Sequence, residues 1–427
     1  MAVLQAELRF DLGALNVNRI FAGATYSELV EDLDMEIEGI RLDDVFAVEW
    51  DLGVDTYLSG FGGSGLRVDG NNIVTAGTVT VYVELVEGSD GDDLSWGLTE
   101  FSVPATSIVA VAMTSRTSDD EQLFRSILSG DDEVELSRWG DVMYGFEAND
   151  RIAGNGGDDR LYGGLGNDVL EGGTGNDALF GGFGDDRVWG GAGNDVVRLD
   201  AGDDMLVGGA GRDWLVATGR DAVRLDLGAD GSQRTGYGQD DIRGFENAAG
   251  GHGGDRLAGS DGANVLEGRA GFDRLWGQGG DDRLAGGKGN DRLAGGDGDD
   301  RLLGGDGRDV LFGGAGRDVL DAGRDRDRDT FVFRAVEDSG RGRARDRLDG
   351  FDSGEDVIKL RGIDADTSRG GNQAFAFSED ERTANAVWLQ DKGAHVVLRA
   401  DVDGDARSDF ELLVRDVAVL EVSDLVL

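Results

Sequence analysis

The sequence contains no cysteine, two histidines and a single proline among 427 residues. Without cysteine the chain can form neither disulfide bonds nor thiolate metal sites, and so few histidines argue against a zinc site. The two histidines, His252 and His395, lie far apart and form no HExxH motif. Residues 1–126 contain neither histidine nor cysteine and no GxSxG motif. This excludes histidine-assisted serine, cysteine and zinc catalysis in that region.

Basic residues and long apolar runs are also scarce. Lys plus Arg number 41 against 86 Asp plus Glu, a formal net charge of −45, which nucleic acid phosphates would repel. No stretch approaches the roughly 20 apolar residues of a membrane span. The N-terminus places Glu7, Arg9 and Asp11 where a secretory signal needs an apolar run. An exported protein of this kind would need its signal elsewhere.

Glycine, by contrast, is abundant, and it follows a period of nine. The 74 glycines are concentrated in copies of a nine-residue word such as GGLGNDVLE at 163–171. The word has glycine at letters 1, 2 and 4, aspartate at letter 6 and Leu or Val at letter 8. One array runs over 154–216, a second over 250–321, and residues 217–249 separate them. The copy at 199–207 lacks its first two glycines.

The period and the letter types predict a stack of short strands. One apolar position in nine cannot form an amphipathic helix, which needs three to four in every two turns. The glycines predict a turn over GGxGxD, and the three remaining letters are enough for one strand whose middle side chain points inward. Stacked copies would bury the eighth letters in single file. These are Leu161, Leu170, Leu179, Val188, Val197, Leu206, Leu215, Leu257, Leu266, Leu275, Leu284, Leu293, Leu302, Leu311 and Leu320.

Stacking also brings the sixth letters together, where like charges repel. Calcium would remove this repulsion, because it takes six to eight oxygen ligands and glycine-rich turns free backbone carbonyls to reach it. We therefore predict multiple Ca²⁺ ions at the sixth letters, with Asn264 as the one uncharged member. The predicted ligands are Asp159, Asp168, Asp177, Asp186, Asp195, Asp204, Asp213, Asp255, Asn264, Asp273, Asp282, Asp291, Asp300, Asp309 and Asp318.

This pattern resembles the RTX family of calcium-binding nonapeptide repeats over about half of the chain, residues 129–330. The resemblance implies a parallel β-roll in which two words make one coil. Calcium would then lie between the turns of words n and n+2, for example between Asp159 and Asp177 or between Asp168 and Asp186. Carbonyls of the first and third letters would complete each site. The first-letter glycines assigned to it are Gly163, Gly172, Gly181, Gly190, Gly286, Gly295 and Gly304.

The regions on either side of the repeats are not repetitive. Residues 1–126 are predicted to form a small, mainly β domain, with strands at Leu8–Leu12 and 77–86 and a glycine-rich turn at 59–65. Residues 25–40 fit either a short helix or a pair of strands. SIVAVAMTS (107–115) fits a buried strand or the start of a helix running to 128. The predicted fold is therefore all-β, with domains at 1–126, 127–330 and 331–427.

The C-terminal region resembles that of serralysin-type secreted proteases, without their protease domain. The resemblance rests on DTFVF (329–333), DRLDGFDSGEDVIKLRGIDA (346–365) and ADVDGDARSDFELLV (400–414). It implies an uncleaved C-terminal signal read by a type I secretion machine. The last four residues, Asp424, Leu425, Val426 and Leu427, fit such a signal, although an ordinary final strand explains them equally well.

Three further features have simpler explanations. Asp401, Asp403, Asp405 and Asp409 have EF-hand-like spacing, but Leu412 stands where that loop needs glutamate, which favours an acidic hairpin turn. Trp189 and Trp276 are adhesive spots or pack on the flank of the roll. The repeated seventh-letter arginines, such as Arg160, are expected to balance charge.

These observations favour a secreted, calcium-folded protein with a non-catalytic binding or structural role. Its partners would be calcium, a type I secretion machine and an extracellular or cell-surface ligand of unknown chemistry. One alternative is a secreted enzyme acting on polysaccharide or lipid through residues 1–126, where Glu49 and Asp51 are a candidate carboxylate pair. Another is an adhesin or surface-layer component. An activity assay separates the first alternative, and calcium-induced self-assembly the second.

Overall fold

The computed structural model describes residues 24–37, 40–51, 56–68, 74–84, 102–104, 130–136, 138, 140–229, 231–323, 325–378 and 383–427. The chain divides into two compact units, Met1–Asp213 and Trp214–Leu427. Nearly every regular element is a β-strand, which confirms the all-β prediction. The strand expected at Leu8–Leu12 and the segments 107–115 and 121–128 lie outside the described residues. No helix in the described part of the chain is long and apolar enough to cross a membrane.

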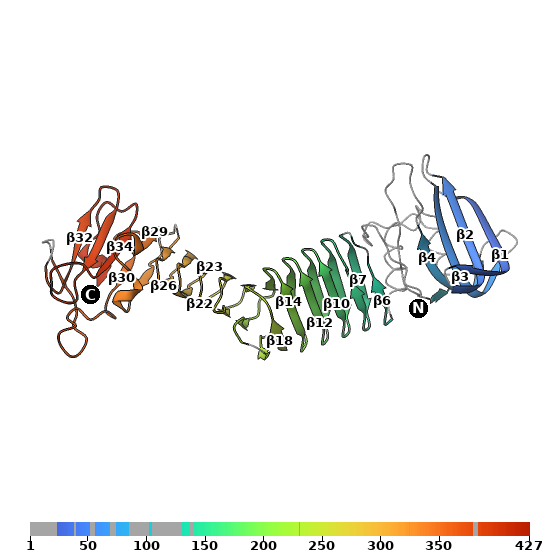
Figure 1. Cartoon of the computed structure of the whole chain (residues 1–427), viewed down its shortest axis with the longest axis horizontal. Coiled ribbons are helices and arrows are strands. Elements are labelled where there is room, and N and C mark those ends of the chain that lie inside the picture. The colour runs from blue at the N-terminus through green and yellow to red at the C-terminus, as the bar shows by residue number, and fades with distance from the viewer. Residues whose placement is uncertain are drawn as a thin grey trace. The chain divides into compact units, whose positions relative to one another are not determined.

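The N-terminal strands form one antiparallel sheet, drawn in blue in Figure 1, in which each strand pairs with the next in sequence. The strands are β1 (Ala24–Ile37), β2 (Ile40–Asp51), β3 (Thr56–Val68), β4 (Val74–Glu84) and β5 (Ser102–Pro104). The helix considered for 25–40 is therefore wrong. The turn predicted for 59–65 is also wrong, because this segment lies within β3 and pairs with β2 on one side and β4 on the other. Backbone pairing on both sides outweighs the low strand propensity of its glycines.

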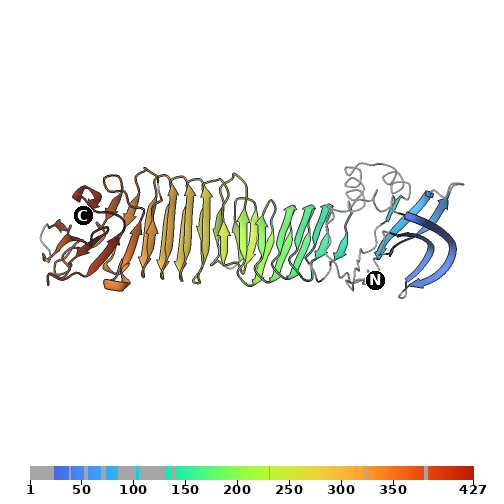
Figure 2. The ribbon, with the colours of Figure 1, turned by 90° about the horizontal axis from the view of Figure 1, so that it is seen from above.

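The first array forms two parallel sheets that face each other, with alternate words contributing to each (green strands, Figure 2). Strand register advances by two words, so Leu170 pairs with Val188 and Leu161 with Leu179. One sheet contains β6 (Glu133–Glu135), β8 (Arg151–Ala153), β10 (Val169–Thr174), β12 (Arg187–Ala192) and β14 (Met205–Ala210). The other contains β7 (Val142–Glu147), β9 (Arg160–Leu165), β11 (Ala178–Phe183) and β13 (Val196–Leu199).

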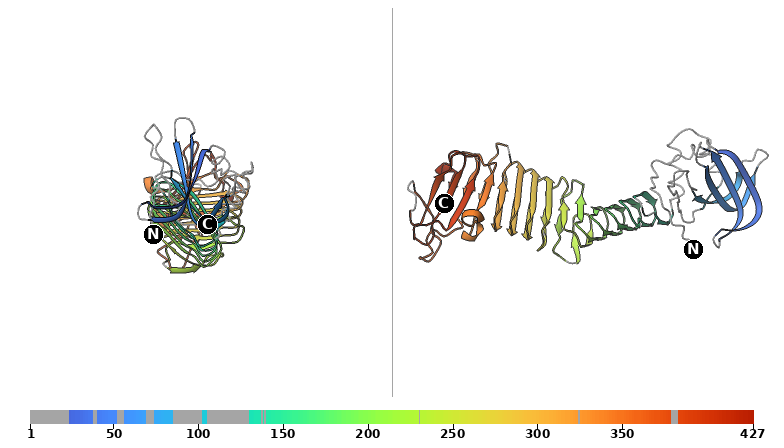
Figure 3. Two further views of the ribbon diagram at one scale, coloured as in Figure 1. Left: turned by 90° about the vertical axis from the view of Figure 1, so that its right-hand side faces the viewer. Right: turned by 45° about the horizontal axis from the view of Figure 1, so that its top comes forward.

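The second unit repeats this architecture (yellow to orange strands, Figure 3). One row is β15 (Trp214–Ala217), β19 (Asn247–Ala249), β21 (Val265–Ala270), β23 (Arg283–Lys288), β25 (Arg301–Asp306), β27 (Val319–Asp321), β29 (Asp346–Asp349) and β34 (Phe410–Val414). The other is β16 (Arg224–Asp226), β20 (Arg256–Ala258), β22 (Arg274–Gly279), β24 (Arg292–Asp297), β26 (Val310–Ala315), β28 (Thr330–Val332), β30 (Val357–Lys359) and β35 (Leu425–Val426).

The remaining elements interrupt or end these rows. The segment between the arrays contains an antiparallel hairpin, β17 (Gly231–Arg234) with β18 (Gln239–Arg243). At the C-terminal end, β31 (Ala376–Phe377), β32 (Ala386–Asp391) and β33 (Val396–Ala400) extend the row that ends in β34. Parallel pairing continues past residue 330, because β28 pairs with β30 and β27 with β29.

The core of the roll is the predicted file of eighth letters. None of these leucines and valines is more than 2% exposed, which confirms that prediction. Most strands of the arrays are longer than the three letters expected, because they continue through letters 1 to 3 of the next word, as in β9 (Arg160–Leu165). The turn is therefore confined to letters 4 to 6. Pairing with the coil on either side keeps the first glycines extended enough to belong to the strand.

Candidate metal sites

The sixth-letter side chains are buried and connected in ladders along each unit. The amide of Asp159 donates to Oδ1 of Asp177 at 2.8 Å, and the amide of Asp168 donates to Oδ1 of Asp186 at 2.8 Å. The same bond recurs every eighteen residues within 141–213 and 255–309. The structure thus brings together the pairs n and n+2 that the resemblance implied. One oxygen of each carboxylate is held by the backbone of the preceding coil.

The second oxygen has no such partner in most words. Oδ2 is buried and accepts no hydrogen bond in a set of aspartates that spans both arrays. The set is Asp150, Asp159, Asp168, Asp177, Asp186, Asp195, Asp273, Asp282, Asp291, Asp300, Asp309 and Asp318. A buried carboxylate oxygen without a donor is costly, and few such atoms occur in stable proteins. Their recurrence at one letter indicates a missing positive charge.

The first-letter glycine marks where that charge fits. A Cβ on Gly163 would lie 2.3 Å from Oδ2 of Asp168 and 2.6 Å from the carbonyl oxygen of Gly181. The carboxylate of one word and the carbonyl of the second following word therefore converge on a space that only glycine leaves open. The same cradle recurs at Gly172, Gly190, Gly286, Gly295 and Gly304. At Gly181 the three nearest atoms all belong to Asp186.

The third-letter carbonyl is used differently. The carbonyl of Phe183 accepts the amide of Gly166 at 2.9 Å, and equivalent bonds join Gly175 to Ala192 and Gly289 to Asp306. These bonds tie the fourth letter of one coil to the third letter of the next. The first-letter carbonyl is thus the one that faces the aspartate, while the third-letter carbonyl connects the coils.

Burial without a counter-charge favours the neutral carboxyl. Desolvation, with the neighbouring aspartates adding to it, raises the pKa of Asp159 from 3.8 to about 8 and that of Asp300 to about 8. For Asp282 the pKa rises to about 6 from the same main cause. A hard divalent cation would reverse these shifts, because carboxylate and carbonyl oxygens are the ligands that calcium takes. The donor set fits calcium and contains no nitrogen or sulfur ligand.

Two predicted sites differ from the rest. Asp255 accepts the amide of Val223 at one oxygen and the amide of Gly251 at the other. Asn264 accepts the amide of Ser260 at 2.7 Å and donates through Nδ2 to the carbonyl of Glu246. The second array therefore begins with two turns whose polar atoms already have protein partners.

A ladder at the fifth letter was missed in the sequence. The amide of Asn167 donates to Oδ1 of Asn149, the amide of Asp185 to Oδ1 of Asn167, and the amide of Asp203 to Oδ1 of Asp185. This row is exposed and satisfies turn amides that would otherwise face solvent. The signal was present, since letter 5 is Asn or Asp in most words of the two arrays.

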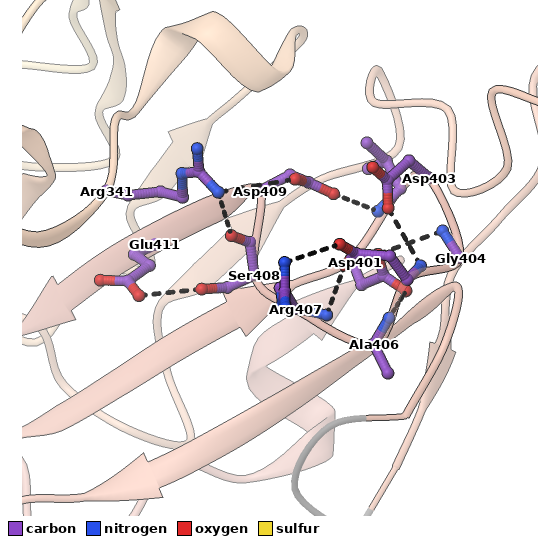
Figure 4. A network of polar contacts seen from close by, with 11 residues as sticks. Arg341, Asp401, Asp403, Gly404, Ala406, Arg407, Ser408, Asp409 and Glu411 are labelled. Carbon is purple, nitrogen blue, oxygen red and sulfur yellow. Dashed lines mark hydrogen bonds and ion pairs between the residues drawn. The ribbon is translucent and has the colours of Figure 1, made fainter.

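The C-terminal acidic cluster lies in the hairpin between β33 and β34 (Figure 4). One carboxylate oxygen from each of Asp401, Asp403 and Asp405 lies within 4.8 Å of the others. Asp401 is fully buried, and its oxygens accept the amides of Asn385, Gly404 and Ala406. Because the fold itself supplies these donors, the geometry supports the hairpin turn that the spacing favoured.

The comparisons with known proteins agree with this geometry over the arrays. The model of the RTX calcium-binding nonapeptide repeat, in four copies, matches residues 144–179, 180–215, 198–230, 250–293 and 294–329. The chain thus carries RTX repeats in a parallel β-solenoid, and these repeats bind Ca²⁺ at multiple positions. No curated protein matches the sequence.

Two solved structures are similar to parts of the chain. The solution structure of the AlgE6R3 subunit from the Azotobacter vinelandii mannuronan C5-epimerase has 26% identity, covering 42% of this chain and 80% of that one, with a TM-score of 0.16. The crystal structure of the extracellular lipase LipA from Serratia marcescens has 17% identity, covering 63% of this chain and 45% of that one, with a TM-score of 0.18. The chain spans less than half of the lipase.

Proposed function

We propose that this chain is a secreted protein whose roll folds when it meets calcium outside the cell, and whose role there is non-catalytic binding or structure. The unpartnered Oδ2 atoms of the sixth-letter aspartates carry the proposal. Without an ion, each folded turn must bury an unpaired carboxylate or protonate it. In calcium, the same carboxylates become ligands.

Many such turns along one stack make the transition cooperative. The backbone amide of each aspartate binds the carboxylate of the next coil, so an ion that orders one turn helps to position the next. Each ion that binds only the folded state adds about 2.7 kcal/mol of stability at a hundredfold excess over its dissociation constant. Extracellular calcium modules have dissociation constants of about 10⁻⁴–10⁻³ M, which keeps the chain unfolded at the low calcium of a cell interior.

The folded position of the C-terminus is consistent with export before folding. Asp424 is buried and accepts the hydroxyl of Ser353 and the amide of Gly354, and β35 pairs with β30. A secretion machine that reads Asp424–Leu427 would find Asp424 and Leu425 fully accessible only in the unfolded chain. Type I export therefore fits a protein that folds only after calcium binds.

Circular dichroism of the full chain, recorded in chelator and then in calcium, tests the proposal. We expect a largely unordered spectrum in chelator and a β spectrum at millimolar calcium, with a steep transition between them. Magnesium is the matched control, because its octahedral shell retains water and fits these turns poorly. Identical β spectra in chelator and in calcium would contradict calcium-dependent folding.

A further inference from the structure

The second letter of the word has a backbone conformation that glycine alone does not explain. In four turns with an unpartnered Oδ2 this letter is left-handed although a residue with a Cβ occupies it: φ is 77° at Phe146, 66° at Asn155, 72° at Arg269 and 79° at Gln278. Such angles are rare for residues with a Cβ, and bulky side chains there are strained. These turns therefore keep the conformation at a cost.

In three other turns the second letter is not left-handed, and its amide donates to the sixth-letter side chain of the same word. We call such a turn closed. Gly251 donates to Oδ2 of Asp255 at 2.9 Å, and Ser260 donates to Oδ1 of Asn264 at 2.7 Å. The third case is Asp352, whose amide donates to Oδ2 of Asp356 at 2.8 Å. In each turn the donor stands four residues before the acceptor. The N–H thus takes the place beside the sixth-letter side chain that a cation would take.

Asp356 belongs to one of two degenerate words that follow the matched repeats. These words are RGRARDRLD at 341–349 and FDSGEDVIK at 351–359, and each has aspartate at letter 6. Their eighth letters, Leu348 and Ile358, are fully buried. Both continue the ladders, because the amide of Asp318 donates to Asp346 and the amide of Asp329 donates to Asp356, each at 2.8 Å.

In the turn at 341–349 the second-letter amide does not donate to the sixth-letter side chain. Its second letter, Gly342, has a φ of 67°, and Oδ2 of the fully buried Asp346 has no hydrogen-bond partner. The hydrogen-bond donors near Asp346 donate to Glu411 instead. Glu411 accepts the amide of Gly342 and the guanidinium of Arg345, and the hydroxyl of Ser339 donates to the carbonyl of Glu411. In the adjacent coil, Oδ2 of Asp318 is also buried and unpartnered.

We propose that a turn binds calcium only where the amide of its second letter does not donate to the sixth-letter side chain. This assigns a calcium-binding turn to 341–349, through Asp346 and beyond the matched repeats, and none to 250–258, 259–267 or 351–359. The ion at Asp346 would fix the last coil of its ladder, where β29 passes to β34 and Leu412 pairs with Asp346. The inference rests on the calcium-dependent folding proposed above.

Equilibrium dialysis of the full chain against calcium, with the bound ions counted, tests the assignment. Asp346→Asn should bind one calcium fewer than wild type. The side-chain amide oxygen of the new Asn still accepts the backbone amide of Asp318, but the Oδ2 that would bind the ion is replaced by an NH₂ group. Asp356→Asn is the matched control and should keep the wild-type count, since Asn264 already occupies a closed turn. An Asp346→Asn variant that binds as many ions as wild type would overturn the inference.

Asn264→Asp decides the same question without removing a ligand. If the turn is closed by Ser260, the new carboxylate should add no ion. If Asn264 merely lacks charge, the variant should gain one, and the inference fails. This result stands even if Asp346→Asn does not fold, which its circular dichroism in calcium would reveal. A wild-type chain that binds no calcium would instead contradict the proposed function.

Discussion

The backbone amide of Asp159 donates a 2.8 Å hydrogen bond to Oδ1 of Asp177, one coil further along the roll. Oδ2 of the same Asp177 is buried and accepts no hydrogen bond. In turns of this kind the fold fixes one oxygen of the carboxylate and leaves the other for an ion. In the folded chain, a ladder built in this way presents a carboxylate oxygen of Asp177 that calcium can bind.

The stability of the calcium-free chain should therefore fall as pH rises. In the ion-free fold, burial raises the pKa of Asp282 to about 6 and that of Asp159 to about 8, against 3.8 for the ordinary group. Because these pKa values are raised in the fold, the carboxyls contribute their full stabilisation below pH 3.8. This contribution is lost as the pH rises through the folded pKa values of about 6 to about 8. Circular dichroism in calcium-free buffer should therefore show more β structure at pH 5 than at pH 8.

Calcium should reverse this dependence, because protons compete with the ion for the same carboxylates. In millimolar calcium the urea midpoint should be higher at pH 8 than at pH 5. If the β content of the calcium-free chain rose with pH instead, the ladder carboxylates would have to be stabilised by the protein itself.

The periodic part of the fold could be predicted because each position of the nine-residue word has the same physical role in every copy. The eighth letters had to be buried, which holds from Leu161 to Leu320. The sixth letters had to meet, which holds within each array, for example between Asp159 and Asp177 and between Asp255 and Asp273. Strand length was not predictable from glycine content, since pairing with adjacent coils extends β9 through Gly163 and Gly164.

The ends of the ladders were missed because insertions hide the period. The amide of Asp309 reaches Asp329 after twenty residues rather than eighteen, and Asp318 reaches Asp346 after twenty-eight. A scan at fixed spacing stops at Asp318, whereas the coil accommodates the extra residues outside the strands. The closed turns at Asp255 and Asn264 were also invisible, because they depend on the backbone angle four residues earlier.

Gly286→Ala should weaken calcium binding. Its Cβ would lie 2.4 Å from Oδ2 of Asp291 and 2.7 Å from the carbonyl oxygen of Gly304, in the space between two ligand oxygens. We expect a loss of about 1–3 kcal/mol in calcium, measured by urea unfolding, and a higher calcium midpoint by circular dichroism. Gly262→Ala is the control, because its Cβ would contact only Oγ of Ser260 at 3.7 Å. Equal midpoints for the two variants would argue against the cradle.

Leu170→Ala should destabilise the calcium-loaded roll by about 2–5 kcal/mol. Leu170 is fully buried and pairs with Val188 and Ile152 in the coils on either side, so its removal leaves a cavity that the stacked strands cannot close. Leu303→Ala is the matched control, because Leu303 is 44% exposed. Thermal unfolding in saturating calcium compares the two. A loss at Leu303 as large as that at Leu170 would contradict a core confined to the eighth letters.

Tyr162→Ala should destabilise the first array through a stack of aromatic rings on one sheet. The ring of Tyr162 lies 4.5 Å from that of Tyr144 and 4.6 Å from that of Phe180, with interplanar angles of 6°. Because both faces of this ring are covered, the variant loses two contacts of about 0.5–1.5 kcal/mol each. Tyr162→Phe keeps the ring stack and should have the same urea midpoint as wild type. Phe183→Ala is the second control, because it removes an aromatic side chain that is 66% exposed. Urea unfolding in calcium should therefore separate Tyr162→Ala from both controls, and a Tyr162→Ala midpoint equal to that of Phe183→Ala would show that the stack contributes no stability.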